Sequence, residues 1–343
     1  MVHNRCREKM EAPIQVGICL NSKWVLCAVS CYKRRNRMGK SNHDAKHFSL
    51  NKKIVGYKTY ESWTSVPHVT FIYEADATGL LDKYYKFKTS NSDVKVTINT
   101  LLLKICVEAI KVAPQVNAHI KYNPKSVTGQ INVKKEIDIS MPWLLENGDI
   151  VAINLRGFES KTLIAMQEYV DKTAAKIKNC DIYIPMYQVS INKIISELKK
   201  GRLLKGTSAL WGTVFGKSQT PKPSRKDMRA YNRIAADDKI LMHDLVPGTI
   251  AISNLGSIYK AQKGFMGILE IIPPQVFAIG IGSIQEKPGV VKNENGEQTI
   301  AIRKVIPMCL AFDHRALNFS DIVPFMQQLD YIFDHPELLE DSW

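Results

Sequence analysis

The sequence of 343 residues lacks the cysteine spacing of a disulfide framework or of a zinc site. Its seven cysteines are an odd number, and no two of them form a Cys-x-x-Cys pair. It also lacks a clear membrane-spanning run, because the apolar stretch at residues 14–32 is interrupted by Gln15, Asn21, Ser22 and Lys23. With no small-residue cleavage site near that stretch, we expect a soluble cytoplasmic protein without a metal and without a membrane partner.

The sequence also has fewer acidic than basic residues, which gives a formal net charge of +14. Such a charge favours an anionic partner, which can be nucleic acid, a membrane surface or a phosphorylated cofactor such as coenzyme A. Part of the basic excess lies in residues 1–47, which we expect to be a basic, solvated amino-terminal arm. Basic and aromatic residues do not interleave as they do on nucleic-acid-binding surfaces, so we expect no nucleic-acid partner.

Regular hydrophobic patterns begin at about residue 48, in a chain that is 45% hydrophobic and 23% charged. Residues 96–112 carry apolar side chains at helical spacing and are followed by Pro114, which predicts an amphipathic helix that ends there. The other patterns predict helices at 51–63, 80–87 and 163–177 and strands at 69–73, 118–122, 130–133, 137–142 and 150–155.

The chain is organised around residues 308–325, where a strand-like apolar run leads into a predicted helix with His314 at the turn. Near the end of a strand the backbone can fix the tautomer of an imidazole, whose reference pKa of about 6.5 suits a general base. If the segment after His314 is helical, Asn318 lies on the same face as the imidazole. A structural histidine with a capping amide gives the same pattern, so both interpretations stay open on this segment alone.

Residues 313–318 resemble the Asp-His-Arg-x-x-Asp/Asn-Gly signature of the dihydrolipoamide acyltransferases, which form the cores of 2-oxo-acid dehydrogenase complexes. Four more segments resemble motifs of that family and occur in the same order as in the family. Residues 61–68 resemble its Ser-x-x-x-x-Pro-His motif, and residues 114–117 resemble its Pro-x-x-Asn motif. Residues 248–256 resemble its Gly-Thr-x-x-Ile-Ser-Asn-Leu-Gly motif, and residues 271–282 resemble its Pro-Pro-(Gln/Glu)-x-Ala-Ile-Leu-Gly-Val-Gly motif. The five segments together span roughly residues 50–340, which makes the resemblance far more specific than any single motif.

The resemblance implies an α/β fold of the chloramphenicol-acetyltransferase type, a two-layer sandwich in which helices cover a mixed β-sheet. Residues 48–343 would form this acyltransferase-like domain, with a divergent segment at about 180–247. The active site of the family lies between subunits, so the resemblance implies a homotrimer or a larger homo-oligomer. Glu340 and Asp341 argue against a large cage because a symmetric contact would bury their charges, whereas Trp343 is a candidate anchor for one.

The chemistry that the resemblance implies is acyl transfer between thiols, with acyl-CoA as substrate and His314 as general base. The reference pKa of an imidazole lies about two units below that of a thiol, so the proton transfer costs about 2.7 kcal/mol. Ser253 matches the family serine that hydrogen-bonds the tetrahedral intermediate, although a serine there is also typical of a turn. Asn318 would support the loop geometry, and Arg315 is expected to form a structural ion pair with Asp313.

Two departures from the family pattern bear on activity. Phe319 stands where the family has glycine, and its side chain would change the backbone or fill part of the channel. Residues 147–155 lack the proline of the family's Gly-Leu-x-x-Pro-Val, in a region that helps to line its substrate channel. The acceptor thus stays open between a dihydrolipoyl thiol and a small molecule, and the alternative is a catalytically silent structural homologue in a complex core.

The chain contains no lipoyl-domain lysine motif and no long Ala/Pro linker, so we expect any lipoyl group to come from a lipoyl-bearing protein on another chain.

Two segments resemble nucleotide-binding loops in part. Residues 211–218 end like a phosphate-binding loop but have Trp211 in place of its first glycine. Gly280 and Gly282 lack the third glycine of a dinucleotide-binding loop, and we expect that pair to close a strand.

Overall fold

The computed structural model describes residues 48–90, 95–199, 222–293 and 295–338. The amino-terminal arm, the segment at 211–218 and the carboxyl-terminal Trp343 lie outside the described residues, so the expectations about them stay predictions. From Phe48 onward the chain forms one compact unit.

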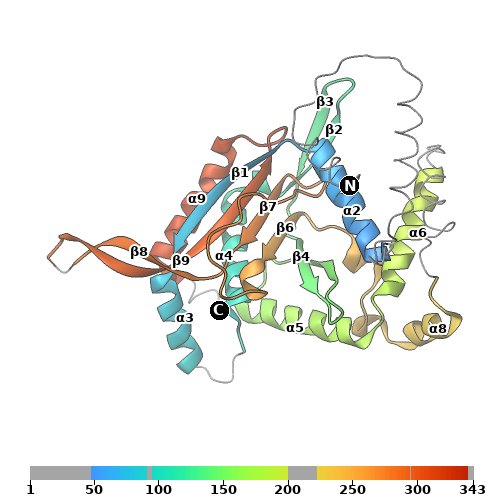
Figure 1. Cartoon of the computed structure of the whole chain (residues 1–343), viewed down its shortest axis with the longest axis horizontal. Helices are drawn as coiled ribbons and strands as arrows, with labels where there is room; N and C mark the ends of the chain where they lie inside the picture. Colours follow the sequence, from blue (N-terminus) through green and yellow to red (C-terminus); the bar gives the residue numbers. More distant parts are fainter. Residues whose placement is uncertain (1–47, 91–94, 200–221, 294, 339–343) are drawn as a thin grey trace, which may run out of the picture. The chain divides into compact units, whose positions relative to one another are not determined.

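A mixed β-sheet is the centre of this unit (Figure 1). Within the described residues it has seven strands, ordered β1 (His68–Asp76), β9 (Gln298–Asp313), β7 (Phe277–Ile281), β6 (Ile250–Asn254), β4 (Ile139–Leu144) and β5 (Ile150–Leu155), with β8 (Gln285–Lys292) pairing the first part of β9. Strand β6 runs parallel to β4 and β7, and the other pairs are antiparallel. A separate hairpin is formed by β2 (Ala118–Asn123) and β3 (Thr128–Val133). The expected α/β fold with a mixed sheet is confirmed.

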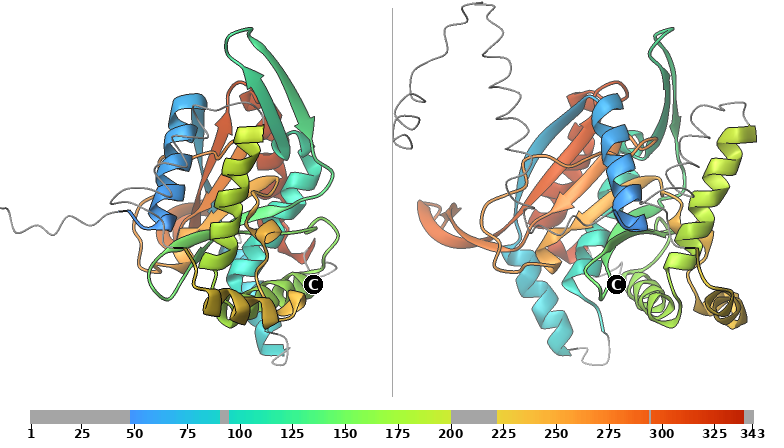
Figure 2. Two further views of the ribbon diagram at one scale, coloured as in Figure 1. Left: turned by 90° about the vertical axis from the view of Figure 1, so that its right-hand side faces the viewer. Right: turned by 45° about the vertical axis from the view of Figure 1, so that its right-hand side comes forward.

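The main helices in the described part of the chain are α2 (Leu50–Ser65), α3 (Thr78–Ser90), α4 (Ile98–Val112), α5 (Leu163–Asn179), α6 (Tyr183–Lys199), α8 (Arg225–Arg233) and α9 (Phe319–Asp334). Helix α4 is buried along most of its length because it packs against both α9 and α5. Its first turn is capped by Thr97, whose hydroxyl accepts a hydrogen bond from the backbone of Thr100, and Pro114 follows its end. Two views from other directions show the elements in depth (Figure 2).

The two faces of the sheet carry different side chains, because successive residues of a strand point to opposite sides. One face bears large apolar residues, such as Ile279 and Leu310, that belong to the main core under the helices. Phe277 on this face meets Phe325 of α9 edge to face, with ring centroids 5.4 Å apart. The opposite face bears small residues, among them Ala278 and Ala311, which pack against the end of α2 and the loop before β7. On the second face, other segments therefore pack close to the strands.

The periodic segments were predicted well, and the divergent segment was not predicted in detail. The helix expected at 96–112 is α4, and the strand expected at 69–73 is the middle of β1. The glycine pair at 280 and 282 closes β7, as expected. The strand expected at 137–142 begins two residues later, at Ile139. Helices α6 and α8 lie in the divergent segment, on either side of residues outside the described ranges.

We predict that Phe325→Ala lowers the free energy of unfolding by about 3–5 kcal/mol, because it removes a fully buried ring from the contact between α9 and the sheet. Denaturant unfolding at a fixed protein concentration measures the change. Tyr331→Ala is the matched control, since Tyr331 lies on the same helix with half of its surface exposed, and its effect should stay within about 0.5 kcal/mol. Equal losses in both variants would contradict the packing described.

Candidate active site

His314 lies in the turn that follows β9, with its side chain exposed on the single chain. Its backbone N–H donates to the carbonyl of Pro67, at 3.2 Å. The ring nitrogen Nδ1 is 3.2 Å from the carbonyl oxygen of Leu317. A carbonyl only accepts hydrogen bonds, so the proton of the neutral ring belongs on Nδ1 and the lone pair on Nε2. The arrangement presents Nε2 as a proton acceptor, which is what a general base requires.

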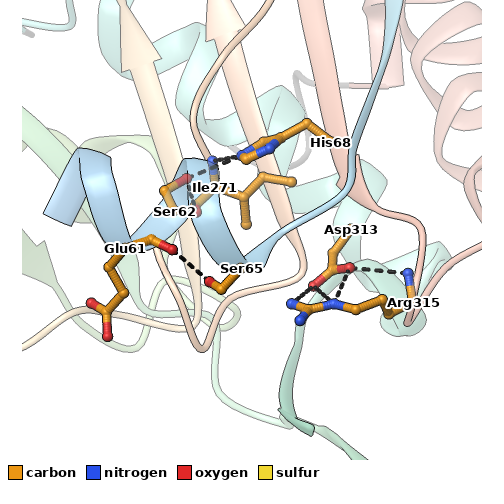
Figure 3. A network of polar contacts seen from close by, with 7 residues as sticks. All are labelled: Glu61, Ser62, Ser65, His68, Ile271, Asp313 and Arg315. Carbon is orange, nitrogen blue, oxygen red and sulfur yellow. Dashed lines mark hydrogen bonds and ion pairs between the residues drawn. The ribbon is translucent and has the colours of Figure 1, made fainter. Parts of the chain in front are cut away.

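The turn around His314 is held by an ion pair between Asp313 and Arg315 (Figure 3). The Asp313 carboxylate is completely buried and accepts from Nη2 of Arg315 at 2.6 Å, from its Nε at 2.9 Å and from its backbone N–H at 3.0 Å. The Arg315 guanidinium also lies over the ring of Tyr122, 5.1 Å from its centroid. The predicted structural ion pair is confirmed.

The segment between His314 and Asn318 is not helical, so the prediction that both side chains lie on one helix face is wrong. Helix α9 begins at Phe319, and Asn318 immediately precedes it as the N-cap residue. The backbone N–H of Asn318 donates to Oδ2 of Asp321, at 2.7 Å. Asparagine is a preferred residue at this position. Its structural place agrees with a loop-supporting residue, and any part in catalysis stays a prediction.

Phe319 does not force an unusual backbone. Among the described residues only Val127 combines a side chain with positive φ, so Phe319 enters α9 without the strain that would call for glycine. Its ring is about half exposed and lies on Phe71 of β1, with centroids 5.5 Å apart. The expected distortion of the backbone is therefore wrong, while a narrowing of the substrate channel stays a prediction.

Residues 147–155, which lack the family proline, form part of the turn and the whole second strand of the hairpin of β4 and β5. Leu144 of β4 pairs with Ile150 of β5, and Gly148 has the positive φ that the turn between them requires. The hydroxyl of Tyr183 donates to the Asp149 carboxylate, which is the main reason that the pKa of Asp149 is lowered. Hydrogen bonds from neighbouring side chains therefore hold this turn, and the position of the missing proline, Ala152, lies within β5.

His68 joins α2 and β1, which adjoin in the sequence, to the distant loop before β7, and the motif match alone does not show this role (Figure 3). Its Nε2 accepts a hydrogen bond from the backbone N–H of Ile271, at 3.1 Å. The hydroxyl of Ser62 donates to the carbonyl of the same residue, at 2.8 Å. Burial is the main cause of the lowered pKa of His68, which favours the neutral ring. The Ser-x-x-x-x-Pro-His motif thus ties α2, β1 and the loop before β7 together.

Ser253 lies near the end of β6, on the sheet face that carries small residues. The turn after it is held by other groups: Oδ1 of Asn254 accepts from the backbone of Ser257, and Gly256 lies so close to Gly282 that a Cβ would be 2.5 Å from its carbonyl oxygen. Among the described residues, no hydrogen bond engages the Ser253 hydroxyl. A serine that only capped this turn would use its hydroxyl there, so the geometry favours a donor kept for another molecule.

One chain does not bring Ser253 and His314 together. Ser253 is the strand neighbour of Gly280, which in turn faces Cys309 in β9. His314 lies five residues beyond Cys309 along the chain, which corresponds to about 16 Å along the sheet. A site that uses both residues therefore needs a second copy of the chain.

The buried Cys309 beside Gly280 is not a nucleophile in this arrangement. Burial raises the pKa of its thiol to about 11, so the reactive thiolate is scarce at neutral pH. Nor do the described ranges contain a cluster of three or more His, Cys, Asp or Glu side chains that could hold a metal ion. Among the described residues that the motifs single out, the imidazole of His314 and the hydroxyl of Ser253 are the candidates for chemistry.

We predict that Arg315→Met lowers the free energy of unfolding by about 3–5 kcal/mol, because it leaves the buried carboxylate of Asp313 without its counter-charge. Chemical denaturation measures the loss. Lys287→Met removes a partly exposed ion pair with Glu74 and should cost no more than about 1 kcal/mol. A loss of that small size for Arg315→Met would show that the buried pair does not hold the turn.

A second prediction concerns pH. Because the pKa of His68 is lower in the folded chain than in the unfolded chain, the unfolded state binds the extra proton first as pH falls. Stability is therefore complete above about pH 6.5 and decreases below it. Unfolding measured from pH 7.5 to 5 should show a shallower decrease in His68→Gln. His119, whose pKa burial also lowers, keeps part of the dependence, and an unchanged curve would contradict the role of His68.

Comparison with known proteins identifies the family. The profile of the 2-oxoacid dehydrogenases acyltransferase catalytic domain matches residues 40–184 and 221–340. An acetyltransferase component of the pyruvate dehydrogenase complex from Zymomonas mobilis is 22% identical over 87% of this chain and 52% of its own length. A mitochondrial lipoamide acyltransferase component of the branched-chain alpha-keto acid dehydrogenase complex from Arabidopsis thaliana is 25% identical over 82% of this chain and 44% of its own. This chain thus spans about half the length of these relatives.

Solved structures show the same fold. The cubic core of a pyruvate dehydrogenase multienzyme complex superposes with a TM-score of 0.58 at 16% identity, over 94% of this chain and 99% of that one. A probable dihydrolipoamide acetyltransferase from Listeria monocytogenes superposes with a TM-score of 0.55 at 17% identity, over 85% of this chain and 95% of that one. In the described part of this chain, no helix has the length and apolar character needed to span a membrane. With the profile matched over most of its length, the chain belongs to the family of 2-oxoacid dehydrogenase acyltransferases, through their catalytic domain.

Proposed function

We propose that this chain transfers an acyl group between coenzyme A and a dihydrolipoyl thiol, with His314 as general base. The observation that carries the proposal is the contact of His314 Nδ1 with the Leu317 carbonyl, which leaves Nε2 as the proton acceptor. Family membership supplies the reaction class, and the relatives are acetyltransferase and lipoamide acyltransferase components of dehydrogenase complexes.

In the proposed reaction, Nε2 of His314 takes the proton from the attacking thiol while its sulfur bonds to the thioester carbonyl carbon. The carbonyl oxygen becomes an oxyanion, which accepts a hydrogen bond from the Ser253 hydroxyl. When the tetrahedral intermediate collapses, the bond to the original sulfur breaks and the imidazolium returns the proton to that sulfur. Protons and electron pairs balance, and no redox partner takes part.

The distance between Ser253 and His314 along the sheet supports a site made from two chains. We propose a homotrimer as the smallest assembly, in which each site takes its histidine from one subunit and its serine from the next. The acceptor would be a lipoyl group borne by a protein, since the names of the relatives refer to dihydrolipoyllysine and lipoamide. A cytoplasmic location is proposed on the sequence alone.

The first test compares the native chain with His314→Ala and Ser253→Ala. Thiol release from acyl-CoA, with dihydrolipoamide as acceptor, should fall to background in His314→Ala and by about 100- to 1,000-fold in Ser253→Ala. Ser257→Ala, in the turn that follows, is the matched control and should keep most of the activity. A folded oligomer that turns over no donor, with dihydrolipoamide or with small-molecule acceptors, would instead identify a catalytically silent structural homologue.

A mixing experiment tests the site between chains. If His314→Ala and Ser253→Ala chains are unfolded together and reassembled in equal amounts, about one quarter of the sites should combine an intact histidine with an intact serine. Activity should then return to about a quarter of the native value, although each variant alone is inactive or nearly so. Activity that stays at the level of the separate variants, in assemblies shown to be mixed, would place both groups within one chain.

A further inference from the structure

The loop between Ser253 and β7 lays the side chain of Met266 directly on Gly280. A Cβ built on Gly280 would lie only 2.1 Å from Cε of Met266, so the methyl group occupies the space that any side chain at position 280 would take. Leu269 of the same loop and Cys309 of β9 are the next atoms around this point, at 3.5 and 3.6 Å. The contact is therefore built by a glycine in the strand and a methionine above it.

Hydrogen bonds hold the loop on both sides of Met266. The side-chain amide of Gln285 donates to the carbonyl of Gly264 at 2.5 Å, and its oxygen accepts from the Gly264 N–H at 3.2 Å. On the other side, the hydroxyl of Thr70 donates to the carbonyl of Gly267, at 3.0 Å. Met266 thus lies between two anchored glycines, and its thioether is positioned by the fold.

Met266 lies over Gly280, the strand neighbour of Ser253. Gly280 and Ser253 are neighbours in the parallel pair of β7 and β6, so a Cβ on Gly280 would point to the same side of the sheet as the serine side chain. Adjacent strands lie about 4.8 Å apart, which places the methyl group of Met266 within a short distance of the serine hydroxyl. On the far side of Gly280 the row continues with Cys309, which is buried.

We propose that Met266 sets the size limit of the acyl group and restricts this enzyme to short acyl chains of the acetyl type. The inference rests on the proposed function, because it takes the Ser253 hydroxyl as the donor to the thioester oxygen. The carbonyl carbon is one bond from that oxygen, so the first atoms of the acyl chain lie beside the serine, where the Met266 thioether takes up room over the glycine. An acetyl group fits within that limit, and a branched or longer chain meets the thioether.

The test measures preference among donors. Values of kcat/KM for acetyl-CoA, butyryl-CoA and isovaleryl-CoA are compared, with dihydrolipoamide as acceptor, in the native chain and in Met266→Ala. The variant should raise the ratio of isovaleryl to acetyl transfer by about tenfold or more, since each methylene in an apolar site is worth at least that factor. Met228→Ala removes a similarly half-buried methionine on α8 and should leave the ratio unchanged.

A second variant keeps the inference testable if Met266→Ala does not fold. Met266→Leu keeps most of the side-chain volume and should retain the native preference, even if Met266→Ala assembles poorly. An unchanged donor ratio in folded, assembled Met266→Ala would overturn the inference. So would an equal rise in the ratio for Met228→Ala.

A binding measurement separates this inference from the proposed function. Dissociation constants of the same acyl-CoAs are measured by calorimetry on His314→Ala, with and without Met266→Ala. A shift of preference toward isovaleryl-CoA in the double variant supports the size limit even if the native chain transfers no acyl group, in which case only the proposed function fails. If no acyl-CoA binds, or if all bind with an unchanged preference, the size limit is refuted.

Discussion

The buried ion pair between Asp313 and Arg315 is the constraint on which the candidate site depends. Asp313 is the last residue of the longest described strand of the sheet, and its carboxylate is completely buried. Two side-chain nitrogens of Arg315, two residues later, donate hydrogen bonds to this carboxylate. A charge in that position is tolerated only while its partner stays in place. The ion pair therefore holds the turn between the two residues, and this turn contains His314.

The two faces of the sheet differ in the size of their side chains, and each face has its own role in the structure. Large side chains on one face pack under the helices and supply most of the hydrophobic stabilisation, which makes the strands a stiff platform. Small side chains on the other face allow the loop before β7 to approach the strands closely, as the contact of Met266 with Gly280 shows. Under the proposed function, the stabilising core and the Ser253 hydroxyl thus lie on opposite faces of the same sheet.

Patterns in the sequence predicted the elements whose side chains repeat regularly, such as α4 and β1, because periodic burial is a property of the local chain. They failed between His314 and Asn318, where an ion pair across two residues, and not a helical period, determines the backbone. The position of Met266 could not be predicted either, since it depends on hydrogen bonds to Thr70 and Gln285. The motifs include His68 and Ser253, but only the structure shows that His68 forms hydrogen bonds and that the Ser253 hydroxyl has no partner among the described residues.

The distance between Ser253 and His314 has a consequence for the isolated chain. Two groups about 16 Å apart along one sheet cannot both contact a single thioester carbonyl, which is far smaller than that span. Under the proposed function, a newly made chain is inert toward acyl-CoA until it meets its neighbours. Assembly itself then serves as the activating step, because only an oligomer brings a histidine and a serine to the same thioester.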